Sequence, residues 1–135
     1  FEDMKWADVI MTQNISNWGG PYTGRLIGKA KEFGKFVHYD TDDLLTDLYE
    51  GHRLKKVYEE NGLSDITKFL YSHSDLVTVT QRKFASRVGS FCTGVLAVVK
   101  NAIDYSLENW NHVKVPPRNK RLVRIGWVEC SSDSC

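Results

Sequence analysis

The sequence predicts an α/β fold, a Rossmann-like parallel sheet flanked by helices. Three observations support this prediction. Short β-prone runs alternate with segments of helical periodicity, turn-forming Gly, Pro and Asn separate them, and the alternation continues from residue 7 to residue 99. Such alternation favours parallel strands joined by right-handed crossovers, here in three layers. A chain of 135 residues is long enough to bury one core of this kind.

The first two strands and the helix between them are predicted from local composition. Residues 7–12, ADVIMT, form a β-prone run that ends in a cluster of turn formers. Pro21 suits the first turn of a helix, and apolar residues recur at helical spacing until Gly34 provides a stop. Residues 35–39 then predict the second strand.

Helical patterns dominate the next segment. The leucines in residues 44–48 predict a helical face directly after an acidic cluster. A further helical stretch begins at Leu54 and closes at Asn61-Gly62, and Ser64 offers an N-cap for another helix. This segment therefore supplies the crossover to the third strand.

Two more strands complete the predicted sheet. Residues 76–80, LVTVT, form the third strand, and Thr80 can cap the following helix, while residues 95–99, VLAVV, form the fourth strand. The pattern then changes. We interpret the chain as a Rossmann-like domain over residues 1–112 that is incomplete at its N-terminus, a linker over 113–120, and the first strand of a missing second domain over 121–135.

The composition excludes several classes of protein. Eighteen basic and seventeen acidic residues nearly cancel, so no overall field favours nucleic acid as a partner. Apolar residues make up 41% of the chain without a membrane-spanning run, which is typical of a soluble globular protein. Three cysteines without CxxC spacing argue against a zinc knuckle or a disulfide framework and favour the cytoplasm. Neither a cofactor nor a bound metal is predicted.

The candidate site is predicted from the topology. In an open parallel sheet, ligands bind beyond the carboxyl ends of the strands, and polar residues follow every predicted strand here, beginning with Gln13. A glycine-rich loop with a tryptophan precedes the first helix, and sugars stack on indole faces. No catalytic residue is assigned. The candidate substrate-binding residues are Asn14, Trp18, Gly19, Gly20, Asp40, Asp42, Asp43, Thr80 and Asn101.

The acidic cluster in FVHYDTDD has several possible uses. Asp42 or Asp43 at the start of a helix can cap its free N–H groups. Asp40 ends an apolar strand, where a half-buried carboxylate needs a donor, a cation or a ligand hydroxyl. His38 lies two residues earlier, on the same face of the strand, where a structural hydrogen bond is the expected use. A magnesium site, phosphoryl transfer and hydrogen bonding to a polyol all fit this cluster.

One of these uses rests on a resemblance. A hydrophobic strand that ends in DxD resembles the haloacid dehalogenase superfamily of magnesium-dependent phosphatases. The resemblance implies Asp40 as nucleophile, Asp42 as acid/base, and Thr80 and Lys100 as phosphate-binding residues. The residues after Asp42 depart from the Gly-Thr of that superfamily, and no later acidic pair of GDxxxD type follows.

Five segments occur in an order typical of another family. They are ADVIMTQ, GKFVHYDTDDLL, SDLVTVTQRKFASRV, VLAVVKNAIDYSLENW and RLVRIGWVECSSDSC. Together they resemble the GT-B fold glycosyltransferases, particularly the retaining bacterial and phage-type members. The likeness spans nearly the whole chain.

This second resemblance implies transfer of a sugar from a nucleotide-sugar donor to a sugar or polyol acceptor, in a cleft between two domains and without an obligatory metal. Asp40, Asp42 and Asp43 would face that cleft. Glu129-Cys130 stand where the family has glycines whose bare backbone lets the donor phosphates approach. The chain would then be a fragment, inactive alone, whose donor-binding residues lie beyond Cys135.

A non-catalytic α/β interaction module is the third possibility. If the sheet ends at residues 7–12, that strand presents an unpaired edge. Pairing of this edge with another copy of the chain would make a homo-oligomer.

Overall fold

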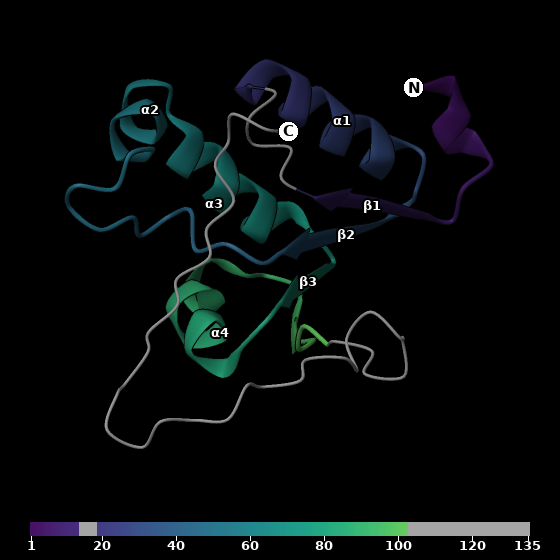
Figure 1. Ribbon diagram of the computed structural model, residues 1–135. Coiled ribbons are helices and arrows are strands. Elements are labelled where there is room, and N and C mark those ends of the chain that lie inside the picture. Colours follow the sequence, from purple (N-terminus) through teal and green to yellow (C-terminus); the bar gives the residue numbers. More distant parts are fainter. Residues whose placement is uncertain (14–18, 103–135) are drawn as a thin grey trace, which may run out of the picture. The chain divides into compact units, whose positions relative to one another are not determined.

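The computed structural model describes residues 1–13 and 19–102 of the chain (Figure 1). The chain divides into two units, residues 1–101 and residues 102–135, and every helix and strand described below belongs to the first. The predicted linker at 113–120 and the strand predicted after it lie outside the described residues. None of the described helices has the length and apolar character that crossing a membrane requires.

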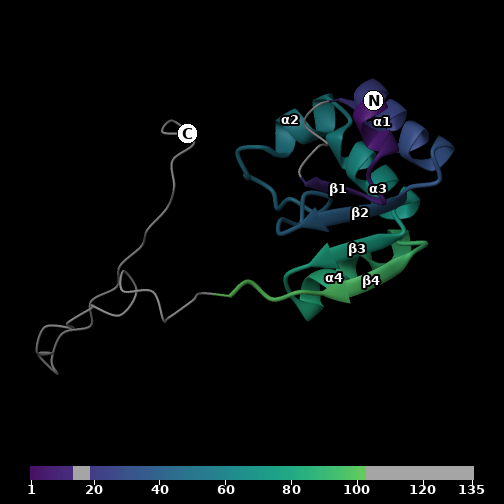
Figure 2. The same ribbon diagram turned by 90° about the vertical axis from the view of Figure 1, so that its right-hand side faces the viewer.

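Four parallel strands form one sheet, as the sequence predicts. They are β1 (Val9–Gln13), β2 (Phe36–Thr41), β3 (Leu76–Val79) and β4 (Val95–Val98), and each pairs with the next in chain order. Figure 2 shows the strands side by side in this order. The α/β class and the parallel sheet are therefore confirmed, with strand boundaries close to those predicted.

The crossovers place the helices on one face of the sheet. When each new strand joins the same edge through a right-handed crossover, successive helices fall on the same side. The core agrees, because Val37 and Tyr39 of β2 and Val77 of β3 pack in one cluster with residues of three helices. The sequence predicts three layers, but the described residues form two. The helices are α1 (Gly20–Glu32), α2 (Lys55–Glu60), α3 (Leu63–His73) and α4 (Arg82–Val88), with 3₁₀ turns at Glu2–Lys5 and Gly89–Phe91.

Apolar side chains from α1, α3 and α4 hold the helices to this covered face. Ile27 of α1, Leu70 of α3 and Phe84 of α4 belong to the core cluster and are at most 4% exposed. Burying a side chain of this size contributes about 1.5–3 kcal/mol to folding. The core therefore fixes the positions of the strands whose carboxyl ends carry the candidate site.

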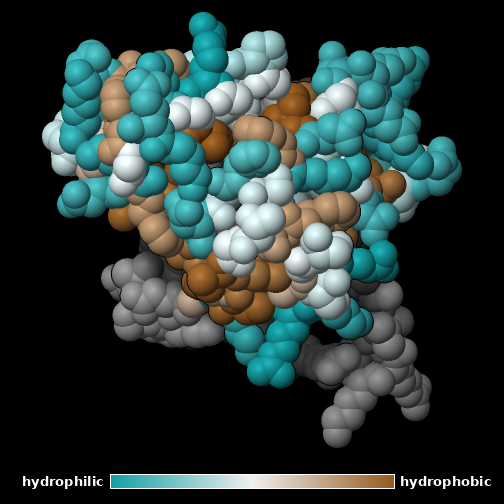
Figure 3. Space-filling view, turned by 180° about the vertical axis from the view of Figure 1, so that it is seen from behind, coloured by the Kyte–Doolittle hydropathy of each residue, from teal (hydrophilic) through white to brown (hydrophobic). Residues whose placement is uncertain are grey.

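The opposite face, here called the open face, carries the alternate residues of each strand. Val9 and Met11 of β1, Phe36 of β2 and Val95 of β4 lie there and are 45–63% exposed. Figure 3 shows hydrophobic residues reaching the surface on the side of the molecule seen from behind. Parallel sheets are ordinarily covered on both faces, so an open face with apolar residues is unusual.

Helix α1 begins and ends where its sequence signals predict. Pro21 lies in its first turn, where a missing backbone N–H removes no helical hydrogen bond. Gly34 follows the helix with a φ of 65°, a left-handed conformation that glycine adopts without strain. The chain can therefore turn directly into β2.

The helix predicted over residues 44–48 is not formed. Turns and irregular structure occupy this segment, and α2 begins only at Lys55. Leu45 is nevertheless buried, because it packs with Tyr58 and Leu63 in a small second cluster. So short a helical pattern does not offset the cost of nucleating a helix, and burial of the leucine is achieved in a loop instead.

The predicted helix caps are also wrong. Asp42 and Asp43 precede turns and begin no helix. Ser64 lies inside α3 rather than at its N-cap. Thr80 precedes Gln81, which is the N-cap residue of α4 and makes no side-chain capping bond. At the starts of α3 and α4 the N-cap residues are Gly62 and Gln81, and neither makes a side-chain capping bond.

Asp75 joins several elements near the amino ends of the strands. Its carboxylate accepts a hydrogen bond from the Val37 backbone N–H at 2.8 Å and pairs with Nζ of Lys31 in α1 at 2.6 Å. Its carbonyl oxygen accepts a hydrogen bond from the Val95 N–H of β4. The lysine first, and then the Val37 amide, hold the pKa of Asp75 below its usual range, against a smaller effect of burial.

Candidate functional site

The carboxyl ends of the four strands form one edge of the sheet, the place where open α/β sheets bind ligands. Gln13 of β1 is the register partner of Asp40 of β2, which is in turn the partner of Thr78 of β3. Partners in register project from the same face of a sheet. These three side chains therefore meet on the open face near its carboxyl edge.

Hydrogen bonds connect these side chains to one another. Gln13 Nε2 donates to Oδ2 of Asp40 at 3.1 Å, and the Thr78 hydroxyl donates to Oδ1 of the same carboxylate. His38 Nε2 lies 2.8 Å from the Thr78 hydroxyl oxygen. We call Gln13, Asp40, Thr78 and His38 the polar row. The prediction that His38 shares a face with Asp40 and makes a structural hydrogen bond is confirmed.

The chemistry of the polar row fixes the direction of its hydrogen bonds. A carboxylate only accepts, so the single proton of the Thr78 hydroxyl is used on Asp40. The hydroxyl oxygen must then accept from His38, which places a proton on Nε2 of the imidazole. Thr78 is only 5% exposed, and both of its hydrogen bonds satisfy a polar group that would be costly to bury alone. Asp40 is consequently held by donors from two neighbouring strands.

The two aspartates that follow Asp40 occupy a different environment. Asp42 and Asp43 are both exposed, and the backbone carbonyl of Asp43 accepts a hydrogen bond from the Thr41 hydroxyl at 3.2 Å. Partial burial, and then the neighbouring Asp42, raise the pKa of Asp43, and His52 partly offsets this. Among residues 1–13 and 19–102, no three His, Cys, Asp or Glu side chains gather closely enough to hold a metal ion.

A hollow of about 270 Å³ lies between this acidic loop and α4. Asp42 lines it from one side, and Lys83 and Arg87 of α4 line it from the other. Arg87 also pairs with Asp47 through a contact of 2.7 Å. The hollow therefore places the carboxylate of Asp42 near two basic side chains.

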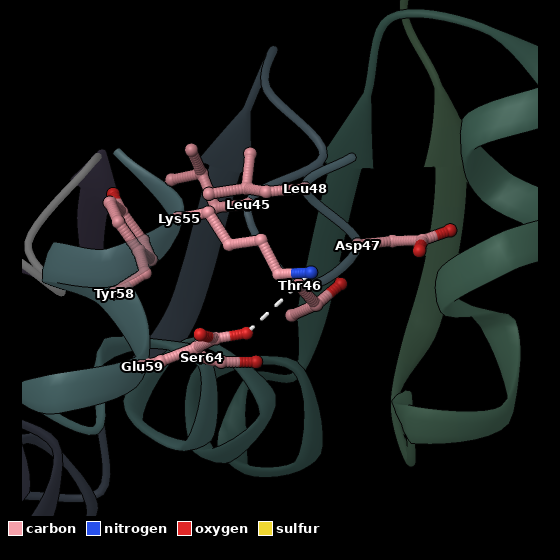
Figure 4. A pocket seen from close by; sticks show the side chains of 8 residues that line it. All are labelled: Leu45, Thr46, Asp47, Leu48, Lys55, Tyr58, Glu59 and Ser64. Atoms are coloured by element: carbon pink, nitrogen blue, oxygen red, sulfur yellow. Dashed lines mark ion pairs between the residues drawn. The ribbon is translucent and has the colours of Figure 1, made fainter. Parts of the chain in front are cut away.

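Two further hollows flank Tyr58 of α2. One, of about 660 Å³, runs from Gly19 and Gly20 at the start of α1 to Leu54 and Val57, whose side chains are 37% and 45% exposed. The other, of about 240 Å³, lies between the 45–48 loop and α2, and Figure 4 shows the side chains that line it, with Lys55 paired to Glu59 at 3.8 Å. The first hollow is lined mainly by apolar groups, and charged side chains line the second.

The other predicted site residues are placed as follows. Asn14 and Trp18 lie outside the described residues. Gly19 and Gly20 line the apolar hollow. Thr80 is half-buried after β3 and Asn101 is exposed after β4, and within residues 1–13 and 19–102 no hydrogen bond joins either of them to the polar row.

Thr78 is the residue that the sequence prediction missed. In LVTVT a threonine is an ordinary β-forming residue, and the predicted site residues of this segment lie only after the strand. A signal was nevertheless present, because Thr78 alternates with the apolar Val77 and Val79 in a central strand. A polar side chain at such a position faces away from the core and needs a partner there.

Known proteins provide no assignment for this site. No family model, curated protein or solved structure matches this chain.

Proposed function

We propose that this chain is the acceptor-binding part of an enzyme that transfers a sugar from a nucleotide-sugar to a hydroxyl-bearing acceptor, and that the polar row binds the acceptor hydroxyls. One observation carries the proposal. Asp40, half-buried at the carboxyl edge, is held by Gln13 from one neighbouring strand and by Thr78 from the other.

A carboxylate held in this way suits hydroxyl recognition. Its two oxygens have about four acceptor sites between them, and Gln13 and Thr78 each use one. Two adjacent hydroxyls of a sugar or polyol can donate to the others with the geometry already fixed. Hydrogen bonds to a charged acceptor are also stronger than those between neutral groups. The polar row therefore offers a pre-oriented site for a diol.

Two further features support a sugar-transferring enzyme. The order of the sequence segments resembles the GT-B glycosyltransferases, whose acceptor side is a parallel sheet with an acidic strand end. The apolar hollow that begins at Gly19 and Gly20 also lies at the start of α1, the first helix after β1 in the described chain. The resemblance implies a second domain as the place where the nucleotide-sugar donor binds.

Phosphoryl transfer is less well supported by the same carboxylate. A nucleophilic aspartate attacks phosphorus through a carboxylate oxygen and needs magnesium ligands beside it. Within the described part of the chain, no group of three His, Cys, Asp or Glu side chains lies beside Asp40 to hold the magnesium. This arrangement favours binding of hydroxyls over attack.

The test is a titration of the full chain with hexoses, linear polyols and aryl glycosides. Binding is monitored through changes in the amide chemical shifts in NMR spectra. We expect a cis-diol sugar to shift the Gln13 side-chain amide and the Thr78 backbone amide. Asp40→Asn should weaken binding about tenfold, equivalent to ~1.4 kcal/mol. Asp47→Asn is the matched control, because that carboxylate pairs with Arg87 away from the polar row.

Two outcomes would overturn the proposal. One is the absence of a shift with every sugar and polyol at concentrations where the spectrum is otherwise unchanged. The other is Mg²⁺-dependent hydrolysis of an aryl phosphate that disappears in Asp40→Asn, because it would assign Asp40 to phosphoryl transfer.

A further inference from the structure

Strand β4 is one edge of the described sheet and carries no feature that discourages pairing. Its sequence from Val95 to Val99 contains neither a charge nor a proline, and Val95, Val98 and Val99 are 63%, 38% and 60% exposed. Within residues 1–13 and 19–102, no strand pairs with the outer side of β4. Natural sheets ordinarily protect such an edge with Lys, Pro or a bulge.

The backbone of β4 shows which residues point outward. The Val95 N–H donates to the carbonyl of Asp75, and the Val99 N–H donates to the carbonyl of Val79, both at 2.9 Å. In a parallel ladder, alternate residues direct both backbone groups to the same neighbour. The backbone groups of Leu96 and Val98 are therefore directed away from β3, to the outer edge.

We propose that the outer edge of β4 pairs with β4 of a second copy of this chain, in an antiparallel ladder around a two-fold axis at Ala97. Leu96 of each copy then faces Val98 of the other, and these are the residues with outward backbone groups. Each such pair exchanges two N–H···O bonds. The two sheets join into one continuous sheet with all helices on the same side.

The side chains fit this register. Val95 of one copy lies opposite Val99 of the other on the open face, while Leu96 lies opposite Val98 on the covered face. Apolar and β-branched cross-strand pairs stabilise a ladder by about 0.2–1 kcal/mol each. Ala97 meets its own copy at a position without hydrogen bonds, where Cα atoms approach to about 4.5 Å and a small side chain fits.

The other edge fits a second copy less well. Antiparallel pairing of β1 around Met11 sets Val9 opposite Gln13 on the open face and Ile10 opposite Thr12 on the covered face. Each of these pairs joins an apolar side chain to a polar one. The edge predicted from residues 7–12 is thus present in the described sheet as strand β1. The side chains of β4, however, match those of a second copy better.

A cysteine at the two-fold axis tests the register. In the full chain with Cys92→Ala, Cys130→Ser and Cys135→Ser, we expect Ala97→Cys to form a covalent dimer on mild oxidation, because Cα atoms about 4.5 Å apart lie within the range of a disulfide. Met11→Cys on the same face of the other edge strand is the matched control and should stay monomeric on a non-reducing gel. Equal yields from the two variants would contradict the proposal.

Sedimentation velocity tests the association without a covalent bond. We expect the wild-type chain to form a dimer as its concentration is raised and Ala97→Lys to abolish it, because two lysines would face each other at the axis. Met11→Lys adds the same charge to the same face of β1 and should leave the dimer intact. A wild-type chain that stays monomeric at every concentration overturns the proposal, as does a dimer that Met11→Lys alone disrupts.

Discussion

At the scale of single residues, the polar row depends on one hydroxyl that is used twice. The Thr78 oxygen accepts from His38 and its proton goes to Asp40, so both neighbours are oriented by a side chain that is itself almost inaccessible. Removing a buried partner leaves the remaining polar groups desolvated and unpaired. Loss of the Thr78 hydroxyl should therefore lower the free energy of unfolding more than loss of the exposed Gln13 side chain.

Thr78→Val tests this role, because valine keeps the shape of threonine and removes the hydroxyl. We expect the free energy of unfolding to fall by about 1–3 kcal/mol, measured by urea denaturation. Thr12→Val is the matched control, since Thr12 is equally buried but its hydroxyl makes only a long bond of 3.4 Å to the His38 carbonyl. Equal losses of stability in both variants would show that the hydrogen bonds of Thr78 contribute no more than the hydroxyl of Thr12.

At the scale of elements, α1 contains glycines that the fold does not require. A Cβ added at Gly24 or Gly28 would meet nothing within 4 Å, so neither position needs glycine for a close approach. Gly34, just after the helix, has a φ of 65° that only glycine adopts readily. The same residue type is therefore dispensable inside α1 and needed at its end.

Alanine substitutions in and after α1 should have opposite signs. Gly28→Ala should raise the free energy of unfolding by about 1 kcal/mol, because alanine loses less backbone entropy in a helix. Gly34→Ala should lower it by about 1–2 kcal/mol, because the left-handed conformation strains a side chain. Thermal unfolding of both variants measures the difference. A loss of stability in Gly28→Ala would indicate a close neighbour at this position.

At the scale of the whole molecule, acid should weaken the fold through Asp75, which joins α1, β2 and β4. Its pKa in the folded chain is lowered from an unfolded value of about 3.9. The unfolded state therefore takes up the proton first, so the stabilisation is complete only above about pH 5, well above the unfolded pKa, and is lost as the pH falls through the folded pKa.

The pH dependence of urea unfolding checks this contribution. Between pH 5 and pH 2 we expect the stability of Asp75→Asn to fall less steeply than that of the wild type. Lys31→Gln should reduce the slope in part, because the Val37 N–H remains as a donor. Lys29→Gln removes a lysine paired at the same 2.6 Å distance but within α1, and its slope should match the wild type. A wild-type slope in Asp75→Asn would assign the acid sensitivity elsewhere.

The sequence predicts the fold closely, but it does not predict which side chains contact Asp40. Alternation of strands and helices is a repeated signal, so β1 to β4 and α1 were found near their true positions. The helix predicted over residues 44–48 is wrong because Leu45 is buried by the distant Tyr58 and Leu63, while Leu44 packs against the main core, and local periodicity does not report such contacts. Thr78 was missed for a similar reason, since its importance comes from the register that places it beside Asp40.

The strand order has a consequence for how the protein is made. Among the described strands, each one after β1 pairs with the strand synthesised just before it. During synthesis, each new strand can therefore pair with the strand that was made just before it, without waiting for later residues of the described sheet. The edge that receives the next strand therefore moves from β1 to β4, the last of the described strands to be synthesised, whose outer side pairs with no other described strand.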